Sequence, residues 1–529
     1  MRLRRLSEIA RQLLTAWKVA CASRPSPDRQ PVLFFNASTR LSGLSQNAAF
    51  SLLTSWAVRL SGTPVIHFVC QRGMSRCVLG TDETKPYKPM PCGMCIRQSQ
   101  VNFFGAPIRW FTYRCEEALA ASLQDLTLDQ LLAYQHPVPK HWSLNTDSCP
   151  LGALVLPSLR WRLRRHHLHD DEPTRFLARE FILSAWNVAQ EFFAVLEREK
   201  PQMVVLFNGL FFPEATAAWL ARQLGVRVIT HESGFQPFSA YFVDGEATAY
   251  SMMIPETELT PTQNALLDAN LERRWQGDFT MAGVRFWKQM ESELPASLKQ
   301  KAARFKQVVV VFSNVIFDTS QIHANILFKD MFTWLDELIS VIQEHPETFF
   351  IFRAHPDETR PGKTSRETIA EWYARHTTQL TNSILIQPDE PISSYELIRL
   401  AQFVLIYNST IGLESILLGK PALAAGRSTA VEFDTVFYEK APEAYWSRLK
   451  RWLTAGPDPV SADRIERTRR FLYYRTYRFS LPFGEFLEAT SPVGYVCLKN
   501  FSPADLLRSP TIQAILGGLF EGKPFEVDA

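Results

Sequence analysis

No apolar run in this sequence is long enough to cross a bilayer, which argues against a chain that spans the membrane. Net charge is also small, because 57 lysines and arginines face 54 aspartates and glutamates and leave +3 at pH 7. That balance lacks the basic excess typical of nucleic-acid-binding proteins, so we expect no nucleic-acid partner. Internal repeats and low-complexity tracts are missing too, which excludes a solenoid.

Residues 1–30 begin with a basic stretch that lacks the uninterrupted apolar core of a secretory signal. Leu6, Ile9, Leu13 and Trp17 recur there at helical spacing, which indicates a basic amphipathic helix. Such a helix either packs on the body of the protein or lies on an anionic membrane surface, and the residues leave both open. We expect a cytoplasmic protein that is also suited to a peripheral place on the inner membrane.

The dominant pattern is an alternation of short β-branched apolar runs with longer helical stretches, which is typical of parallel α/β sheets. Because 529 residues exceed one ordinary core, we expect an α/β fold of two Rossmann-like, doubly wound domains that face a cleft. The expected divisions are the N-terminal helix at 1–30, a first domain at 31–256 with an insertion or lid at about 71–200, a helical linker at 257–305, a second domain at 306–435 and a helical C-terminal segment at 436–529.

Strands are predicted at 31–36, 65–69, 203–207 and 226–230 in the first domain, and at 307–312, 348–353, 383–387, 403–407 and 421–424 in the second. In open parallel sheets, ligands bind at the carboxyl ends of the strands. The polar residues that directly follow these runs are therefore the candidate site residues.

One candidate group follows the strand at 348–353 and consists of Arg353, His355 and Pro356. The ring of His355 can donate to a phosphate or sugar oxygen, and Pro356 fixes the following turn. The competing interpretation is a turn histidine that holds no ligand.

A second group follows the strand at 403–407 and consists of Asn408, Ser409, Thr410 and Glu414. Ser409 or Thr410 can cap the next helix, whose first amides would then suit a nucleotide phosphate. Glu414 stands four residues after Thr410 and could accept the hydroxyls of a ribose. An ordinary helix cap with a surface glutamate is the alternative.

Weaker signals come from three further residues. Asn314 follows the nearly all-valine strand at 307–312, in the first loop of the second domain. In the first domain, His231 and Glu232 follow a strand, and either could act as a general base toward an acceptor hydroxyl. Structural hydrogen bonding around the glycine turn that follows them is an equally open interpretation.

Together, His355-Pro356, the run from Asn408 to Glu414 and Gly419-Lys420-Pro421 resemble the nucleotide-binding domain of bacterial capsule polysaccharide biosynthesis proteins. They also resemble motifs of sialyl- and Kdo-transferases that use CMP-sugars.

The resemblance implies a GT-B-like glycosyltransferase that is inverting and needs no metal for catalysis, with a CMP-, UDP- or GDP-sugar as donor and a glycan or lipid-linked acceptor. Polysaccharide assembly proteins would be further partners. The same resemblance implies that the second-domain motifs hold the donor, and that Glu232 is the base.

Four of the eight cysteines cluster in the sequence: Cys70, Cys77, Cys92 and Cys95. They could close a structural zinc site, although their spacing is not that of two zinc knuckles, and ordinary reduced thiols are the alternative. The basic tract at 159–169 would suit an anionic acceptor or form a solvated helix face.

Two other functions stay open. A non-hydrolysing nucleotide-sugar epimerase uses the same two-domain fold and needs no acceptor. A GT-B-like subunit of a polysaccharide assembly complex would have the fold without turnover, because fold does not fix function.

Overall fold

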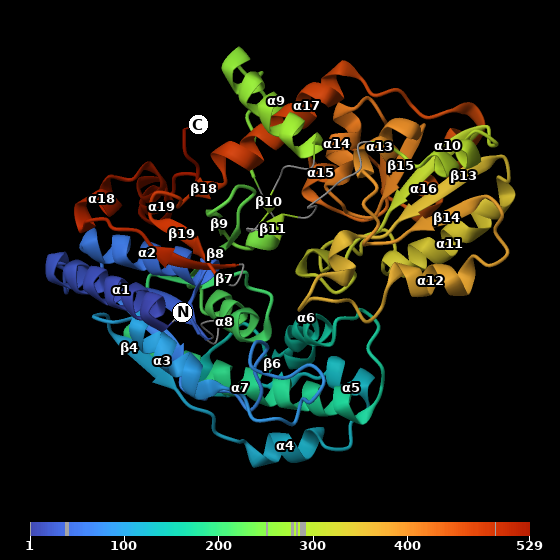
Figure 1. The fold of residues 1–529 in the computed structure, drawn as a ribbon. Helices are drawn as coiled ribbons and strands as arrows, with labels where there is room; N and C mark the ends of the chain where they lie inside the picture. Colours follow the sequence, from blue (N-terminus) through green and yellow to red (C-terminus); the bar gives the residue numbers. More distant parts are fainter. Residues whose placement is uncertain are drawn as a thin grey trace.

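The chain folds into two β-sheets, the first mostly parallel and the second wholly parallel, each covered by helices, that face each other across the middle of the molecule (Figure 1). The computed structural model describes residues 2–37, 42–249, 252–276, 280–281, 284–285, 293–491 and 494–528. The predicted α/β fold, with two doubly wound domains facing a cleft, is confirmed.

The first sheet has seven strands in the order β18-β9-β8-β7-β1-β3-β4. Its strands are β1 (Val32–Asn36), β3 (Val65–Cys70), β4 (Ile108–Phe111), β7 (Met203–Phe207), β8 (Arg227–Ser233), β9 (Ser239–Asp244) and β18 (Leu481–Pro482). Five adjacent strands of this sheet, β4, β3, β1, β7 and β8, run parallel, whereas β9 and β18 are antiparallel to their neighbours. The order in which strands are added to the sheet reverses at β1: β3 and β4 lie on one side of it, and β7 and β8 lie on the other. Folds of this type bind ligands at such a switch point.

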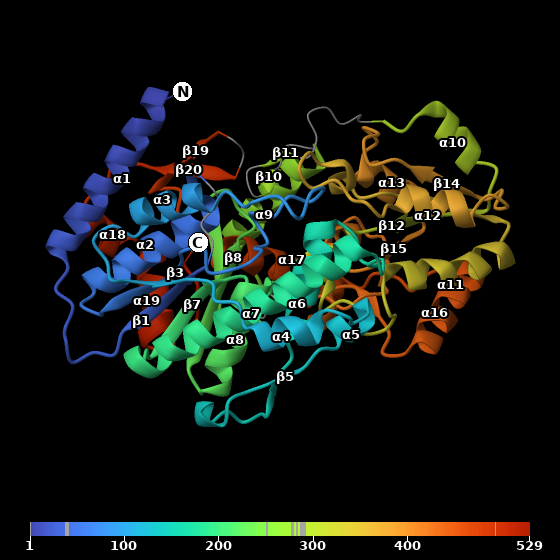
Figure 2. The same ribbon diagram turned by 90° about the horizontal axis from the view of Figure 1, so that it is seen from below.

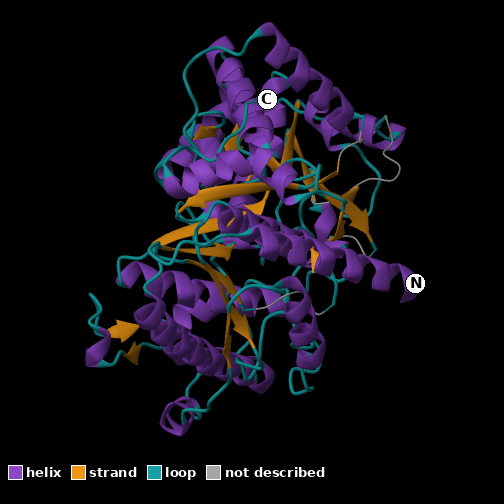
Figure 3. Cartoon of the chain, turned by 90° about the vertical axis from the view of Figure 1, so that its left-hand side faces the viewer, coloured by secondary structure: helices purple, strands orange, loops and turns teal. Residues whose placement is uncertain are grey.

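Alternate residues of β1 enter two different cores, as the twofold period of a strand requires. Val32 and Phe34 face a layer of four helices, α1 (Arg2–Ala22), α2 (Gln46–Leu60), α18 (Pro503–Arg508) and α19 (Pro510–Phe520). Leu33 and Phe35 face the opposite layer, which is built from α4 (Glu117–Leu123), α5 (Leu128–Leu132), α6 (Leu151–Leu163), α7 (Glu172–Glu199) and α8 (Phe212–Gln223). Figure 3 shows the strands enclosed between these helices.

The second sheet is wholly parallel, in the order β14-β13-β12-β15-β16-β17. Its strands are β12 (Gln307–Phe312), β13 (Thr348–Arg353), β14 (Ser383–Ile386), β15 (Phe403–Ile406), β16 (Ala422–Ala424) and β17 (Phe437–Tyr438). The covering helices are α11 (Met331–Glu344), α12 (Ile369–His376), α13 (Ser394–Leu400), α14 (Ile411–Leu417), α15 (Thr429–Glu432) and α16 (Pro442–Ala455). Every residue of β12 and β13 is buried, as expected for strands covered on both faces.

The linker and the C-terminal part connect the two halves. Helices α9 (Pro261–Trp275) and α10 (Ala296–Ala302) pack on the core of the second domain, and so does α17 (Ala462–Tyr473). The chain then crosses back through a π-helical turn at 474–478 to β18 in the first sheet. Strands β19 (Leu487–Thr490) and β20 (Tyr495–Leu498) form a small sheet with β2 (Leu44–Ser45). Two-stranded pairs are formed by β5 (His136–Pro137) with β6 (Ser148–Cys149), and by β10 (Thr280–Met281) with β11 (Val284–Arg285).

Three predicted divisions differ from the structure. The region at 71–200 is not a simple insertion, because β4 extends the first sheet and α7 covers one of its faces. The second domain continues past 435, since β17 and α16 belong to its sheet and core. The segment at 436–529 is not purely helical, and its last part completes the first domain with β18, α18 and α19. Short, two-residue strands of this kind carry no readable periodicity.

Candidate active site

A cleft of about 800 Å³ lies between the carboxyl ends of the two sheets. All ten residues predicted for catalysis and donor binding line it: His231, Glu232, Asn314, Arg353, His355, Pro356, Asn408, Ser409, Thr410 and Glu414. Parallel strands explain this gathering, because their carboxyl ends share one edge of each sheet. Their roles stay predictions, and their surroundings differ in what they permit.

Glu232 is half-buried on the first-domain wall of the cleft, near the end of β8. One carboxylate oxygen accepts the amide of Asn208 at 2.5 Å and the other accepts the backbone N–H of Ser233 at 2.7 Å. Burial raises the pKa of Glu232 above its ordinary value, against the lowering effect of the two hydrogen bonds. A fixed carboxylate with a raised pKa is suited to accept a proton near neutral pH.

His231, the alternative base, is buried completely. Its ring stacks on Phe242 with centroids 5.1 Å apart, and neither ring nitrogen has a hydrogen-bond partner in the described structure. Burial lowers the pKa of His231 to about 3, so the ring is neutral. These surroundings favour a packing role for His231 over the role of a general base.

His355 lies half-buried directly after β13. Its Nδ1 accepts the backbone N–H of Asp357 at 3.1 Å, which fixes the tautomer with the proton on Nε2. Burial lowers the pKa of His355, so the ring is a neutral donor. Pro356 begins the short 3₁₀ turn that follows. Nε2–H is thereby available to a phosphate or sugar oxygen in the cleft.

Asn314 and Asn408 follow the neighbouring strands β12 and β15, and the side-chain amide of Asn314 donates to Oδ1 of Asn408 at 2.5 Å. Asn408 also donates to the carbonyl of Ser320 at 3.1 Å and accepts from Gln321 at 3.2 Å. These contacts position the loop after β12. Both residues therefore shape the cleft even before any ligand contact is considered.

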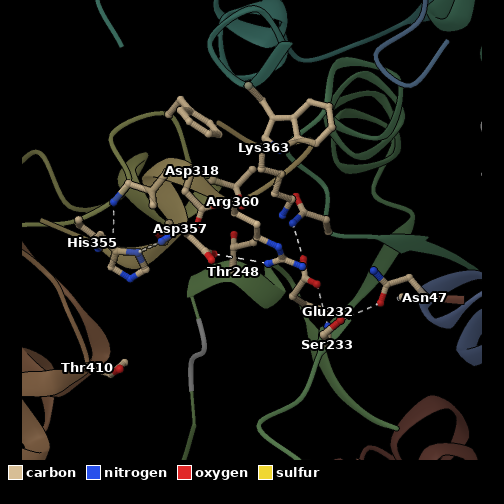
Figure 4. Close-up of a pocket in the computed structure, with 18 of the residues that line it drawn as sticks. Asn47, Glu232, Ser233, Thr248, Asp318, His355, Asp357, Arg360, Lys363 and Thr410 are labelled. Atoms are coloured by element: carbon tan, nitrogen blue, oxygen red, sulfur yellow. Dashed lines mark hydrogen bonds and ion pairs between the residues drawn. The ribbon is translucent and has the colours of Figure 1, made fainter. Parts of the chain in front are cut away.

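Ser409 and Thr410 precede α14, as predicted. The hydroxyl of Ser409 accepts the backbone N–H of Ile411 at 3.4 Å, whereas Thr410 makes no side-chain cap and is exposed. Gly412 is explained by packing, because a Cβ there would lie 2.5 Å from Ile406. Figure 4 shows Thr410 apart from the polar group around Glu232, on the second-domain side. The Thr410 hydroxyl stays available to a ligand.

Glu414 is buried rather than a surface residue of α14. It forms an ion pair with Arg274 of α9 at 2.6 Å and accepts the hydroxyl of Tyr395 at 3.2 Å. A carboxylate has about four acceptor positions, so the pair leaves capacity for a ribose hydroxyl. This partner was not predictable from the sequence, because Arg274 lies in the linker, 140 residues before Glu414.

Arg353 is 2% exposed, and its guanidinium binds the backbone carbonyls of Gln387 and Glu390. Its own carbonyl accepts the hydroxyl of Ser313 at 3.2 Å. These contacts tie β13 to the loop after β14. The placement favours a structural role for Arg353 over direct donor binding.

The family model of capsule polysaccharide biosynthesis proteins matches residues 278–452. That segment contains all the donor-binding candidates, from Asn314 to Glu414. The predicted resemblance is confirmed there.

A curated relative, protein FixF of Sinorhizobium fredii (strain NBRC 101917 / NGR234), is 23% identical over 234 residues, which are 43% of this chain and 48% of FixF. The chain thus spans about half the length of this relative.

Solved structures superpose on this chain with low sequence identity and low TM-scores. The beta Kdo 2,4 transferase KpsC of Thermosulfurimonas dismutans is 12% identical, with 58% of this chain and 88% of that chain covered and a TM-score of 0.37. The UDP-GlcNAc 2-epimerase of Neisseria meningitidis, bound to UDP-GlcNAc, is 11% identical, with 84% and 98% covered and a TM-score of 0.24. Overlaps this loose assign no activity.

The structure adds cleft residues that the sequence analysis missed. Asp318, Arg360 and Lys363 lie between His355 and Glu232 (Figure 4). Burial lowers the pKa of Lys363, while Asp318 raises it. Arg475, in the π-helical turn, places its guanidinium 3.5 Å from the ring centroid of Phe235. Turns of the π-helical type recur at functional sites. Arg360 and Lys363 could have been proposed from the sequence, because they are basic residues that soon follow His355-Pro356.

The basic tract at 159–169 contacts the second domain through Arg164, while His167 and His169 are exposed. Arg164 donates to the carbonyl of Gly362 at 3.0 Å, and its own carbonyl accepts the N–H of Arg366 at 2.8 Å. These bonds join the end of α6 to the loop that carries Lys363. The tract therefore fixes one edge of the cleft.

His167 forms a second link between the domains. Its Nε2 lies 3.3 Å from Asp330, the N-cap of α11, and its Nδ1 lies 2.6 Å from Glu367. Hydrogen bonds to both carboxylates raise the pKa of His167 to about 9, so the ring is protonated at neutral pH. We call His167 and these two carboxylates the domain bridge.

Proposed function

We propose that this chain transfers a sugar from a nucleotide-sugar donor to a glycan or lipid-linked acceptor in the synthesis of a capsule or surface polysaccharide. The supporting observation is the composition of one cleft. Its second-domain wall carries the polar residues of the segment that matches the capsule family, and its first-domain wall presents a fixed carboxylate.

On the second-domain wall, the donor would be held by neutral hydrogen-bonding groups, by one carboxylate and by cations. His355 offers Nε2–H, and Ser409 and Thr410 offer hydroxyls to the phosphates. Glu414 accepts a ribose hydroxyl beside its ion pair with Arg274. Arg360 and Lys363 supply positive charge where the leaving phosphate gains negative charge.

On the first-domain wall, Glu232 is the proposed general base. Its carboxylate takes the proton of an acceptor hydroxyl, and the freed oxygen attacks the anomeric carbon as the bond to the phosphate breaks. Attack from the face opposite the leaving group inverts the configuration at that carbon. No metal enters this step, because hydrogen-bond donors and cations stabilise the leaving group.

The first helix supports a place at a membrane surface. Helix α1 packs through Ala16 and Val19, which are fully buried, and leaves Leu6, Leu14 and Trp17 62%, 51% and 55% exposed. It runs along the outer edge of the molecule (Figure 2). Arg5 and Lys18 are exposed beside this apolar strip.

An apolar strip with basic flanks fits an anionic lipid surface. Among the helices of the described residues, none combines the length and apolar character needed to cross a membrane. We infer that α1 brings the cleft to an inner-membrane surface that carries the acceptor. Replacing Leu6, Leu14 and Trp17 with glutamine should abolish sedimentation of the chain with anionic vesicles. As a control, the unmutated chain should bind neutral vesicles only weakly. Unchanged sedimentation would contradict this role for α1.

The proposal is tested by incubating the purified chain with labelled CMP-, UDP- and GDP-sugars, with and without an acceptor extract from capsulated bacteria. Acceptor-dependent release of nucleotide, together with label in the glycan or lipid fraction, is the expected result. Conversion of a free nucleotide sugar into its epimer without acceptor would favour the epimerase. Nucleotide binding with no turnover on any acceptor would favour a non-catalytic subunit.

A further inference from the structure

The four clustered cysteines of the first domain come together in space. Cys70 ends β3, Cys77 lies in the following loop, and Cys92 and Cys95 are in the first turn of α3 (Cys92–Asn102). All four line one cavity of about 30 Å³. We call these four residues the thiol cluster. Chain segments that are separate in sequence thus bring four cysteines to the wall of one space, of the size that one water molecule or ion occupies.

The wall of this cavity is otherwise almost entirely apolar. Its other lining residues are Ala37, Arg72, Met74, Leu79, Gly80, Met90, Pro91 and Ile96. No carboxylate or histidine is among the described residues that line it, and Arg72 is exposed to solvent. The chemistry of the cavity is therefore that of thiols alone.

Two of the thiols are held by a recurring backbone contact. The N–H of Gly73 donates to Cys70 Sγ at 3.2 Å, and the N–H of Gly80 donates to Cys77 Sγ at 3.1 Å. A Cβ at Gly80 would lie 3.0 Å from Cys77 Sγ, so glycine permits the close approach. Both contacts join a cysteine to the glycine three residues later. These amide hydrogen bonds fix the orientation of the two sulfurs.

We propose that the thiol cluster binds one zinc ion as a closed, structural tetrathiolate site. Zinc prefers four thiolates in tetrahedral geometry, and thiolate softness disfavours magnesium or calcium. Within the described chain, no three of the four sulfurs lie within 4.8 Å of one another, a spacing met by His166, His167 and Asp330. Zinc binding would therefore require the cysteine side chains to rotate about their single torsion and bring the sulfurs closer together.

The zinc ion would also stabilise the active cleft. Met74, Cys77 and Leu79 line both the thiol cavity and the large cleft. Fixing Cys77 therefore fixes part of the first-domain wall. This places the metal in a structural role, apart from the transfer chemistry.

The test is metal analysis of the full chain, purified in a reducing buffer without a metal-affinity column. About one zinc per chain is expected. The Cys92→Ser/Cys95→Ser double variant should lose the metal, whereas Cys21→Ser/Cys115→Ser, which removes two exposed thiols, should keep it. The unmutated chain, stripped of zinc and titrated with Co²⁺, should give the intense visible and thiolate charge-transfer bands of a tetrahedral tetrathiolate. This second measurement does not depend on the folding of a variant.

Three results would overturn the proposal. The first is a chain that contains no zinc and gives no thiolate bands with Co²⁺ under reducing conditions. The second is bound iron with its own visible spectrum, and the third is a disulfide within the thiol cluster. Because metal content is read without any sugar substrate, failure here is distinguishable from failure of the proposed transfer activity.

Discussion

Glu232 lies near the end of a strand, lines the cleft and has a pKa that burial raises. The Glu232→Gln change should leave donor binding intact in calorimetry and lower turnover by roughly 10²–10⁴-fold. Asp244→Asn, which removes a mostly exposed carboxylate of the neighbouring strand β9, should leave turnover unchanged. Turnover of the unmutated chain should rise with pH as Glu232 loses its proton. Wild-type rates in Glu232→Gln would remove it as the base.

Glu414 has a structural partner that must be separated from any ligand role. Glu414→Gln and Arg274→Gln both break the 2.6 Å ion pair, but only the first removes the carboxylate. If Glu414 binds the ribose, Glu414→Gln should lower nucleotide affinity by about 1.5–3 kcal/mol in calorimetry, the usual contribution of a hydrogen bond to a charged group. Equal losses of affinity in the two variants would show that the carboxylate only holds α9 against α14.

Glu214 is buried in the first turn of α8, and burial raises its pKa to about 8. Because its folded pKa is raised, its contribution to stability is fully present below the ordinary value near 4.5 and is lost as pH rises through about 8. The melting temperature should therefore fall over this range by an amount that reflects a few kcal/mol. In Glu214→Gln the fall should be smaller. Identical pH profiles for the two proteins would refute the buried, protonated state.

At the scale of elements, the loop between α6 and α7 joins the domains through the domain bridge. His167, which is about half-exposed, faces Asp330 and Glu367, with His166 beside it. Since its pKa is raised from 6.5 to about 9, the bridge is complete below pH 6.5 and lost as pH rises through about 9.

His167→Gln should increase hydrogen exchange at the start of α11 at pH 7, and high pH should have the same effect on the unmutated chain. His169→Gln, in the same loop and paired with Arg165, is the matched control. If exchange at α11 is the same in both variants, the bridge does not hold the domains.

Elements buried on both faces were the most readable in the sequence. Continuous apolar runs predicted β12 and β13 at their observed bounds, and polar residues that follow these strands line the cleft. Strand β4 was missed because three of its four residues are only half-buried, so it shows no clear pattern. The ion pair of Glu414 with Arg274 was also unreadable, because it joins positions 140 residues apart.

At the scale of the whole molecule, the chain crosses between the two domains more often than a simple succession of domains would require. The segment after 473 returns to the first domain and covers the sheet together with α1 and α2. The linker helix α9 meanwhile reaches the cleft through Arg274. In both crossings, a segment that is distant in sequence packs against the other domain or lines the cleft. The two doubly wound domains could therefore be predicted from the sequence, but their limits could not.

Binding of a nucleotide sugar to the second-domain wall of the cleft can be measured with a thermal-shift panel of CMP, UDP, GDP, UMP and dTDP on the purified chain. We expect at least one nucleotide to stabilise the fold, by about 2.7 kcal/mol at 100 times its dissociation constant, and Thr410→Val and His355→Ala to weaken the shift. No shift with any nucleotide, or an undiminished shift in both variants, would contradict binding at this wall.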